Sequence, residues 1–230
     1  MKKLLVLFVA IFALWGTIQK VQAASYTVSA LTDIWLASQP NAASVTGNFG
    51  TDTAPLNSPV SISVTAGNVL TFSATGSTSV DGSCFAGPDG GCYSDESGFS
   101  PSPASNTYKG PADALIGVFL PSGVTDVASG PASLDYTQTA NTSQTTYTPG
   151  LNQIFFIGDG LTGTGTGAVQ DFVVPAGATN LYLAVADSIG GSNNNVGSLV
   201  VTTPVPEPTS PILLGLGLGA ASIVGWRFKA

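Results

Sequence analysis

The residues best suited to chemistry lie in one loop late in the chain, where oxygen-bearing side chains follow a carboxylate. Asp187 ends an apolar run, two glycines come next, and three asparagines, the last of them Asn195, precede another apolar segment. Carboxylate, amide and backbone oxygens are the ligands of Ca²⁺, which takes six to eight of them at about 2.3–2.6 Å. The loop therefore suggests a Ca²⁺ site, although an ordinary Asn/Gly turn has the same composition.

Catalysis and nucleic-acid binding find little support in the composition. The chain has no histidine, so a Ser-His-Asp or Cys-His arrangement cannot be assembled. Between residues 24 and 204, Lys109 is the one basic residue against twelve acidic ones, about eleven net negative charges. Such a surface cannot neutralise phosphates, which excludes nucleic acid as a partner. We expect a binding or structural protein and not an enzyme.

The elements that must position the loop are predicted to be β-strands. Residues 60–64 alternate apolar and polar side chains, a turn is expected at 66–68, and residues 69–74 are again rich in apolar side chains. This pattern predicts a β-hairpin. Short β-rich runs follow at 115–120, 154–157, 169–174, 181–185 and 199–203. The Gly/Thr stretch 159–167 is expected to be a flexible surface loop. The pattern predicts an all-β domain, an antiparallel β-sandwich over residues 25–204.

The two ends of the chain are apolar and unlike the middle. Residues 1–24 combine two early lysines, an apolar run and small residues at a cleavage position, which is the pattern of a signal peptide. A retained N-terminal anchor is the alternative. Residues 211–226 form a second apolar run that would span roughly 24 Å as a helix, marginal for a hydrocarbon core of about 30 Å.

The segment 205–230 has a recognisable order of features. Val205, Pro206, Glu207 and Pro208 precede the apolar run, and Arg227 begins a short basic end. This segment resembles the PEP-CTERM sorting signal of Gram-negative bacteria. The resemblance implies transient anchoring in the inner membrane through a single transmembrane helix and processing by an exosortase-type enzyme. A plain membrane anchor with a proline-rich stalk is the alternative.

Two cysteines, Cys84 and Cys92, lie on either side of a turn-forming stretch of seven residues. In an exported chain such a pair predicts a disulfide that closes a local loop. A metal site at the cysteines is disfavoured, because the chain offers neither a histidine nor a second cysteine pair.

Residues 187–198 resemble the calcium-dependent galactose-binding lectin family of bacteria, and residues 69–80 resemble a strand and loop of that family. The resemblance implies a lectin-like jelly roll in which sugar hydroxyls complete the coordination of Ca²⁺. It implies the following ligands: side-chain oxygens of Asp187, Asn194 and Asn195, and backbone carbonyls of Val80 and Gly191.

The chain departs from that family in one region. It has no histidine to touch the sugar and carries an insert at residues 82–111. Tyr93 and Tyr108 in the insert are the residues that would stack on a sugar face. We therefore expect an exported protein of the periplasm, cell surface or extracellular matrix that binds carbohydrate through Ca²⁺ in association with exopolysaccharide. A structural matrix or surface-layer protein without sugar binding is the alternative.

Overall fold

The computed structural model describes residues 23–93, 108–124 and 130–204. The residues from Ala23 to Pro204 cluster as one compact unit. Nearly all of the predicted signal peptide and the whole sorting segment 205–230 lie outside the described residues, as do Val205, Pro206, Glu207, Pro208 and Arg227. Within the described ranges, no helix is long and apolar enough to cross a bilayer.

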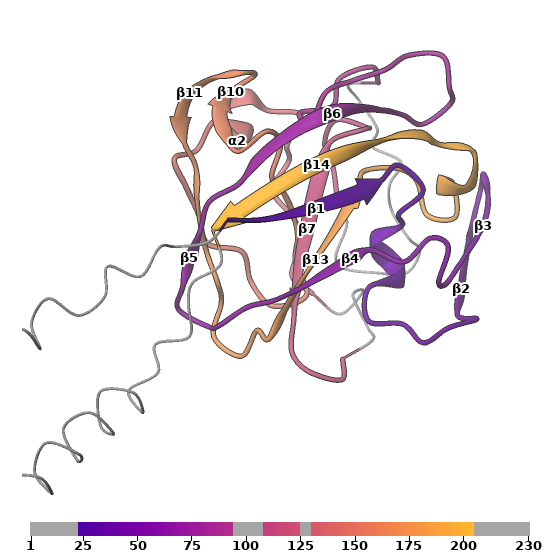
Figure 1. Ribbon diagram of the computed structural model, residues 1–230, viewed down its shortest axis with the longest axis horizontal. Coiled ribbons are helices and arrows are strands. Elements are labelled where there is room, and N and C mark those ends of the chain that lie inside the picture. Colours follow the sequence, from indigo (N-terminus) through magenta and orange to yellow (C-terminus); the bar gives the residue numbers. More distant parts are fainter. Residues whose placement is uncertain (1–22, 94–107, 125–129, 205–230) are drawn as a thin grey trace, which may run out of the picture. The chain divides into compact units, whose positions relative to one another are not determined.

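Two antiparallel sheets form the body of the unit (Figure 1). One sheet has the order β1 (Ala23–Ser29), β14 (Val196–Pro204), β6 (Ser73–Ser79). The other has the order β4 (Val60–Ser63), β13 (Asn180–Val185), β7 (Leu115–Leu120), β9 (Ile154–Phe156). Both sheets contribute to one hydrophobic core, which includes Leu199 and Val201 of β14 and Leu181 and Leu183 of β13. The predicted all-β antiparallel sandwich is confirmed.

Smaller elements surround these sheets. Three further small sheets pair β2 (Ser44–Gly47) with β3 (Gly50–Thr53), β10 (Leu161–Gly163) with β11 (Thr166–Val169), and β12 (Asp171–Val173) with both β5 (Val69–Leu70) and β8 (Thr146–Tyr147). The β8–β12 pair is parallel. The described helices are short: η1 (Ile34–Leu36), α2 (Thr139–Thr142) and η3 (Ser192–Asn194). None of them is long enough to form a layer of its own.

The core is apolar and rich in aromatic rings. All six residues of β7 are buried, so both faces of that strand are covered. Phe155 stacks on Phe119 with ring centroids 5.0 Å apart, and Phe172 lies 5.0 Å from Tyr147 and 5.1 Å from Phe72. Ring pairs at these separations contribute about 0.5–1.5 kcal/mol each beyond the apolar area they bury. Phe155 also lies 5.8 Å from Phe172, so the cluster joins the sheet of β7 and β9 to β8 and β12.

Two sequence predictions about local structure are wrong. The runs at 60–64 and 69–74 do not form a hairpin, because β4 pairs with β13 and β5 pairs with β12 in a different sheet. The chain between them passes from one sheet to another. The stretch 159–167 is not a loop throughout, because β10 and β11 pair within it and just beyond it. Local sequence does not report the pairings of β4 and β5, since each is decided by a distant strand, whereas β10 and β11 form a local hairpin.

The central strand of the first sheet, β14, runs between the two ends of that sheet. Ala23 pairs with Pro204, so both described ends lie side by side at one end of the sheet. Val196, at the other end of β14, pairs with Ser79. Eight residue steps of about 3.3 Å separate Val196 from Pro204, roughly 26 Å. The loop that precedes Val196 is therefore displayed at the end of the sheet far from Pro204.

Candidate functional site

A pocket of about 220 Å³ opens where β6 and β13 end. Residues brought to it from three parts of the chain include Val80, Asp81, Tyr93, Asp187, Gly191 and Asn194. Four of the five predicted Ca²⁺ ligands therefore border one pocket, together with one of the two predicted stacking tyrosines. Carboxylate, amide and backbone carbonyl oxygens are all present, which is the donor set that Ca²⁺ prefers.

The predicted ligands lie close to one another in this pocket. The Asp187 Oδ1 accepts a hydrogen bond from the Ser188 N–H at 2.6 Å. A Cβ atom placed on Gly191 would lie 3.2 Å from the Asp187 Oδ2, so the glycine keeps space beside the carboxylate. The Asn194 side-chain amide donates to the Val80 carbonyl at 3.3 Å, across 114 residues of sequence.

Asn195 points inward from the same loop. Its side chain is only 6% exposed, and its Nδ2 donates to the Ala30 carbonyl at 3.1 Å. Its Oδ1 is buried and accepts no hydrogen bond from the described residues. Because an unsatisfied buried acceptor costs about 1–3 kcal/mol, this oxygen is suited to a ligand. Asn195 does not line the open pocket but stands one residue before Val196, whose partner Ser79 precedes Val80.

Two buried carboxyl groups hold the loop in place from behind. The Asp33 Oδ2 accepts the Gly190 N–H at 3.1 Å, and the Asp52 Oδ2 accepts the Ser192 N–H at 2.8 Å. Burial raises the pKa of Asp33 to about 7, and the neighbouring Asp52 carboxyl adds to the increase. The conformation of the loop therefore depends on residues more than 130 positions earlier in the chain.

The tip of the β2–β3 hairpin packs on the same loop. A Cβ on Gly47 would lie 1.8 Å from the Ile189 carbonyl oxygen, and a Cβ on Gly190 would lie 2.5 Å from the Gly50 carbonyl oxygen. Only glycine permits backbones to approach this closely. Between Gly47 and Gly50, the ring of Phe49 is 76% exposed and borders the pocket. The sequence analysis did not identify Phe49, since only the packing of the hairpin tip brings it here.

The disulfide loop leads to another residue that borders the pocket, Tyr93. Cys84 and Cys92 are bonded, with their Cα atoms 5.9 Å apart, so the predicted disulfide is confirmed. Tyr93 follows directly, and its hydroxyl donates to the Asp81 Oδ2. This hydrogen bond is the largest cause that lowers the pKa of Asp81 to about 2, so Asp81 is charged at neutral pH. The Tyr93 ring is 37% exposed at the pocket.

The other predicted stacking residue, Tyr108, lies elsewhere. It is 3% exposed, and its ring stacks on Tyr136 with centroids 5.7 Å apart. Its hydroxyl donates to the Pro111 carbonyl at 3.5 Å. The structure therefore places Tyr108 among the core residues, where a sugar in solvent does not reach its ring.

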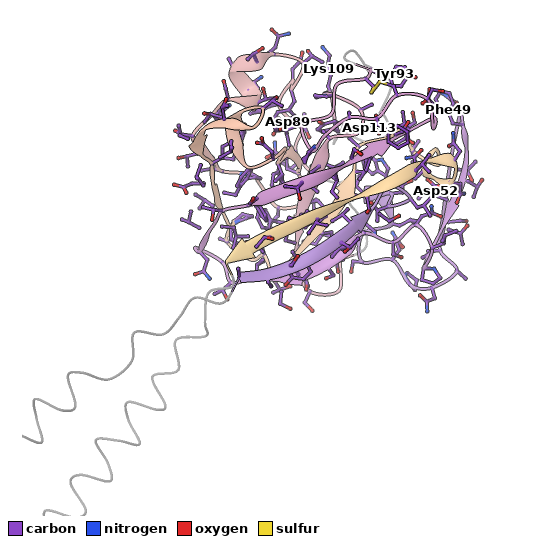
Figure 2. All side chains as sticks on the ribbon, turned by 45° about the horizontal axis from the view of Figure 1, so that its top comes forward. Phe49, Asp52, Asp89, Tyr93, Lys109 and Asp113 are labelled. Carbon is purple, nitrogen blue, oxygen red and sulfur yellow. A yellow bond between two sulfur atoms is a disulfide. The ribbon has the colours of Figure 1, made fainter. Side chains whose placement is uncertain are left out.

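A further carboxylate, Asp113, lies beside the pocket and was not identified from the sequence. It is fully buried, and neither Oδ1 nor Oδ2 has a hydrogen-bond partner among the described residues. Its backbone has a φ of 67°, in the left-handed region. Burial raises the pKa of its carboxyl to about 7, and the charge of Asp187 is the next largest cause. Figure 2 shows Asp113 at the same end of the unit as Phe49 and Tyr93.

Side-chain carboxylates alone do not make a metal centre at this pocket. No group of three or more Asp, Glu, His or Cys side chains is placed to hold a metal in the part of the chain that the structure describes. An ion here would need amide and backbone carbonyl oxygens beside the carboxylates. Asn194, Asn195 and the Val80 carbonyl are such groups, and the unsatisfied Oδ1 of Asn195 fits that requirement.

Comparisons with known proteins give one structural likeness and one sequence match. No curated protein matches the chain. Among solved structures, the chain is similar to the N-terminal domain of EclA, described as a PllA-like lectin, with 16% identity over 78% of this chain and 93% of that chain, at a TM-score of 0.36. The family model described as the PEP-CTERM protein-sorting motif matches residues 204–230. The chain therefore carries a PEP-CTERM sorting motif, which implies export and a place in the cell envelope.

Proposed function

We propose that the unit from Ala23 to Pro204 is a non-catalytic binding module that holds Ca²⁺ at the pocket and binds carbohydrate through the ion. The observation that carries the proposal is the convergence of Asp187, Asn194 and the Val80 carbonyl between two exposed aromatic rings. The Val80 carbonyl comes from a sequence position more than 100 residues before Asp187 and Asn194. A turn stabilised only by its own residues would not need this convergence.

The ion would bind and orient the sugar, whereas an enzyme would use an acid and a base to react with it. Ca²⁺ accepts six to eight oxygen ligands, more than the protein groups at the pocket supply. Vicinal hydroxyl groups of a sugar are suitable for the remaining positions. Such coordination orients the sugar and cleaves no bond, which agrees with a chain that has no histidine.

The aromatic rings suit the apolar face of a sugar. Phe49 and Tyr93 both border the pocket, one from the β2–β3 tip and one next to the disulfide loop. An aromatic ring offers large contact area and a π-face to the C–H groups of a sugar ring. Asp81, which is charged and bound to the Tyr93 hydroxyl, can also accept hydrogen bonds from sugar hydroxyls.

The test is calorimetry of the exported protein with Ca²⁺, followed by a panel of monosaccharides and exopolysaccharide fragments in Ca²⁺ and in chelator. We expect Ca²⁺ binding, and sugar binding that chelator abolishes. Ca²⁺ binding without any response to sugars would favour the second candidate, a structural matrix or surface-layer protein whose ion only stabilises the loop. A protein that binds neither would contradict both uses of the pocket.

We also propose that an exosortase-type enzyme removes the sorting segment after export. The match at residues 204–230 supports this step. Replacing Pro206, Glu207 and Pro208 by alanine should leave export intact and retain the C-terminal segment in the membrane fraction. Mass spectrometry of the intact protein measures whether the segment is removed. If the variant is processed and released like the parent, the motif is only a proline-rich stalk and not a processing signal.

A further inference from the structure

Asp113 is a buried carboxyl group whose environment lacks a partner for its charge. Both of its oxygens are buried and without a hydrogen bond from the described residues. Its backbone, in contrast, is held firmly: its N–H donates to the Ala186 carbonyl at 2.9 Å, and its carbonyl accepts the Thr78 hydroxyl at 3.1 Å. A loose backbone is therefore not the reason why the side chain lacks a hydrogen-bond partner.

The same contacts place Asp113 between the two strand ends that form the site. Ala186 immediately precedes Asp187 at the end of β13, and Thr78 stands two residues before Val80 at the end of β6. Ala112, the residue before Asp113, borders the pocket itself. Asp113 thus lies between the ends of β6 and β13, next in sequence to a residue that borders the pocket, while Asp187 borders the pocket from the loop.

We propose that Asp113 supplies a second carboxylate to the cation site bordered by Asp187 and Asn194, an inference that rests on the proposed function. Buried carboxylates in proteins are paired, hydrogen-bonded or bound to metal. Among the described residues neither carboxylate oxygen of Asp113 accepts a hydrogen bond of normal length and angle, and the nearby Thr78 hydroxyl and Val80 N–H carry no charge. The one salt bridge among the described residues joins Lys109 to Asp135 instead. A divalent ion beside Asp113 supplies the missing positive charge.

This arrangement gives the insert 82–111 a role. Gly91 donates its N–H to the Ala112 carbonyl at 3.2 Å, and Leu115 donates to the Pro88 carbonyl at 2.8 Å. The disulfide loop therefore packs along both sides of Asp113 and helps keep its backbone at the positive φ. In this way the insert brings a second anionic ligand to the site and also carries Tyr93.

A second carboxylate should change what the site selects. Two negative charges and neutral oxygens favour a divalent ion over Na⁺ or K⁺, because each added anionic ligand strengthens the attraction for the higher charge. Ca²⁺ bound by both carboxylates also joins the end of β13 to the segment before β7. We therefore expect the ion to lock the core sheet as well as the loop.

The test compares three variants of the exported protein by calorimetry with Ca²⁺. Asp113→Asn should raise the Ca²⁺ dissociation constant at least about tenfold, and Asp187→Asn should do the same. Asp89→Asn is the matched control, since Asp89 is also partly buried with a raised pKa but lies at a different pocket. In chelator, Asp113→Asn should unfold at a higher temperature than the parent, because it removes an uncompensated buried charge.

A second measurement keeps the test decisive if Asp113→Asn does not fold. With ¹³C-labelled aspartate, one carboxyl resonance of the parent should shift on addition of Ca²⁺ and be identified as Asp113 by its absence in Asp113→Glu. If the parent binds Ca²⁺ and loses it in Asp187→Asn while neither Asp113 variant nor that resonance responds, the second ligand is wrong and the proposed function stands. A parent that binds no Ca²⁺ overturns both.

Discussion

Two Gly-rich loops of this protein contain a single aspartate each and resemble one another in composition, yet their oxygens are used differently. In the β10–β11 region, the Asp159 Oδ1 accepts the Leu161 N–H at 2.8 Å and its Oδ2 accepts the Gly165 N–H at 2.6 Å. Both acceptors are used inside one hairpin. The Asp159 carboxylate is therefore satisfied within its own hairpin, whereas the Asp159 N–H is bonded from outside, to Asp89 at 2.9 Å.

The loop between β13 and β14 is held from outside. Its backbone N–H groups at Gly190 and Ser192 bond to Asp33 and Asp52. Buried oxygens remain without a hydrogen bond at Asn195 in the loop and at Asp113 beside it. An acidic, glycine-rich loop thus becomes a candidate site when tertiary contacts fix its backbone and leave oxygens in and beside it without hydrogen bonds.

The largest expected effect separates the two loops directly. Asp187→Asn should weaken Ca²⁺ binding about a hundredfold, because it removes an anionic ligand but keeps the size of the side chain. Stabilisation by Ca²⁺, about 2.7 kcal/mol at a hundredfold excess over the dissociation constant, should be lost with it. Calorimetry and thermal unfolding with and without Ca²⁺ measure both.

Asp159→Asn is the control for that change. It should leave Ca²⁺ affinity unaltered and lower the free energy of unfolding by about 0.5–1.5 kcal/mol, since a carboxylate that accepts two backbone N–H groups becomes an amide with one acceptor oxygen. Equal loss of Ca²⁺ binding in both variants would mean that the two loops do not differ as their contacts indicate.

The second expected effect concerns Asp33, the buried carboxyl group that accepts a hydrogen bond from Gly190 of the site loop. The folded pKa of Asp33 is raised to about 7 from an ordinary value of 3.8. The stabilisation that Asp33 contributes as a neutral group is therefore complete below pH 3.8 and is lost as the pH rises through about 7. In chelator, the free energy of unfolding should fall by a few kcal/mol between pH 4 and 8.

Asp33→Asn tests the origin of that slope by denaturant titration at each pH. The variant keeps an acceptor for Gly190 but cannot ionise, so the fall should become shallower. Part of the slope should remain, because burial also raises the pKa of Asp113 to about 7. An unchanged slope would show that Asp33 does not titrate against Asp52 in this range.

A third effect is expected at the wall of the pocket. Replacing Cys84 and Cys92 by serine should lower the free energy of unfolding by about 2 kcal/mol, because the bond closes a loop with a sequence separation of only 8. Sugar affinity should fall, since Tyr93 is adjacent to the bond, while Ca²⁺ affinity should fall less. Calorimetry beside denaturant unfolding separates the two losses.

The smallest effect tests whether an exposed ring at the site differs from an exposed apolar side chain elsewhere. Phe49→Ala should weaken sugar binding about three- to tenfold, the equivalent of about 0.5–1.5 kcal/mol of ring contact, and leave Ca²⁺ binding unchanged. Val169→Ala, on β11 and also more than half exposed, should change neither. Equal sugar affinity in both variants would remove Phe49 from the proposed site.

The sequence by itself determined the class of the fold, because short β-rich runs between turn residues predict strands wherever they pair. The runs at 115–120, 181–185 and 199–203 became β7, β13 and β14 with small changes at their ends. The disulfide also followed from spacing and export. These properties depend on residue type and short-range order, which sequence reports directly.

Only the tertiary structure decided which residues meet. The pairing of β4 with β13, the approach of Phe49 to Gly191 and the position of Asp113 all join segments far apart in the chain. Asp113 follows an unremarkable Pro-Ala pair, and nothing in its neighbours indicates a ligand. Whether a carboxylate is satisfied depends on donors supplied by distant strands, so its lack of a partner becomes visible only when the whole fold surrounds it.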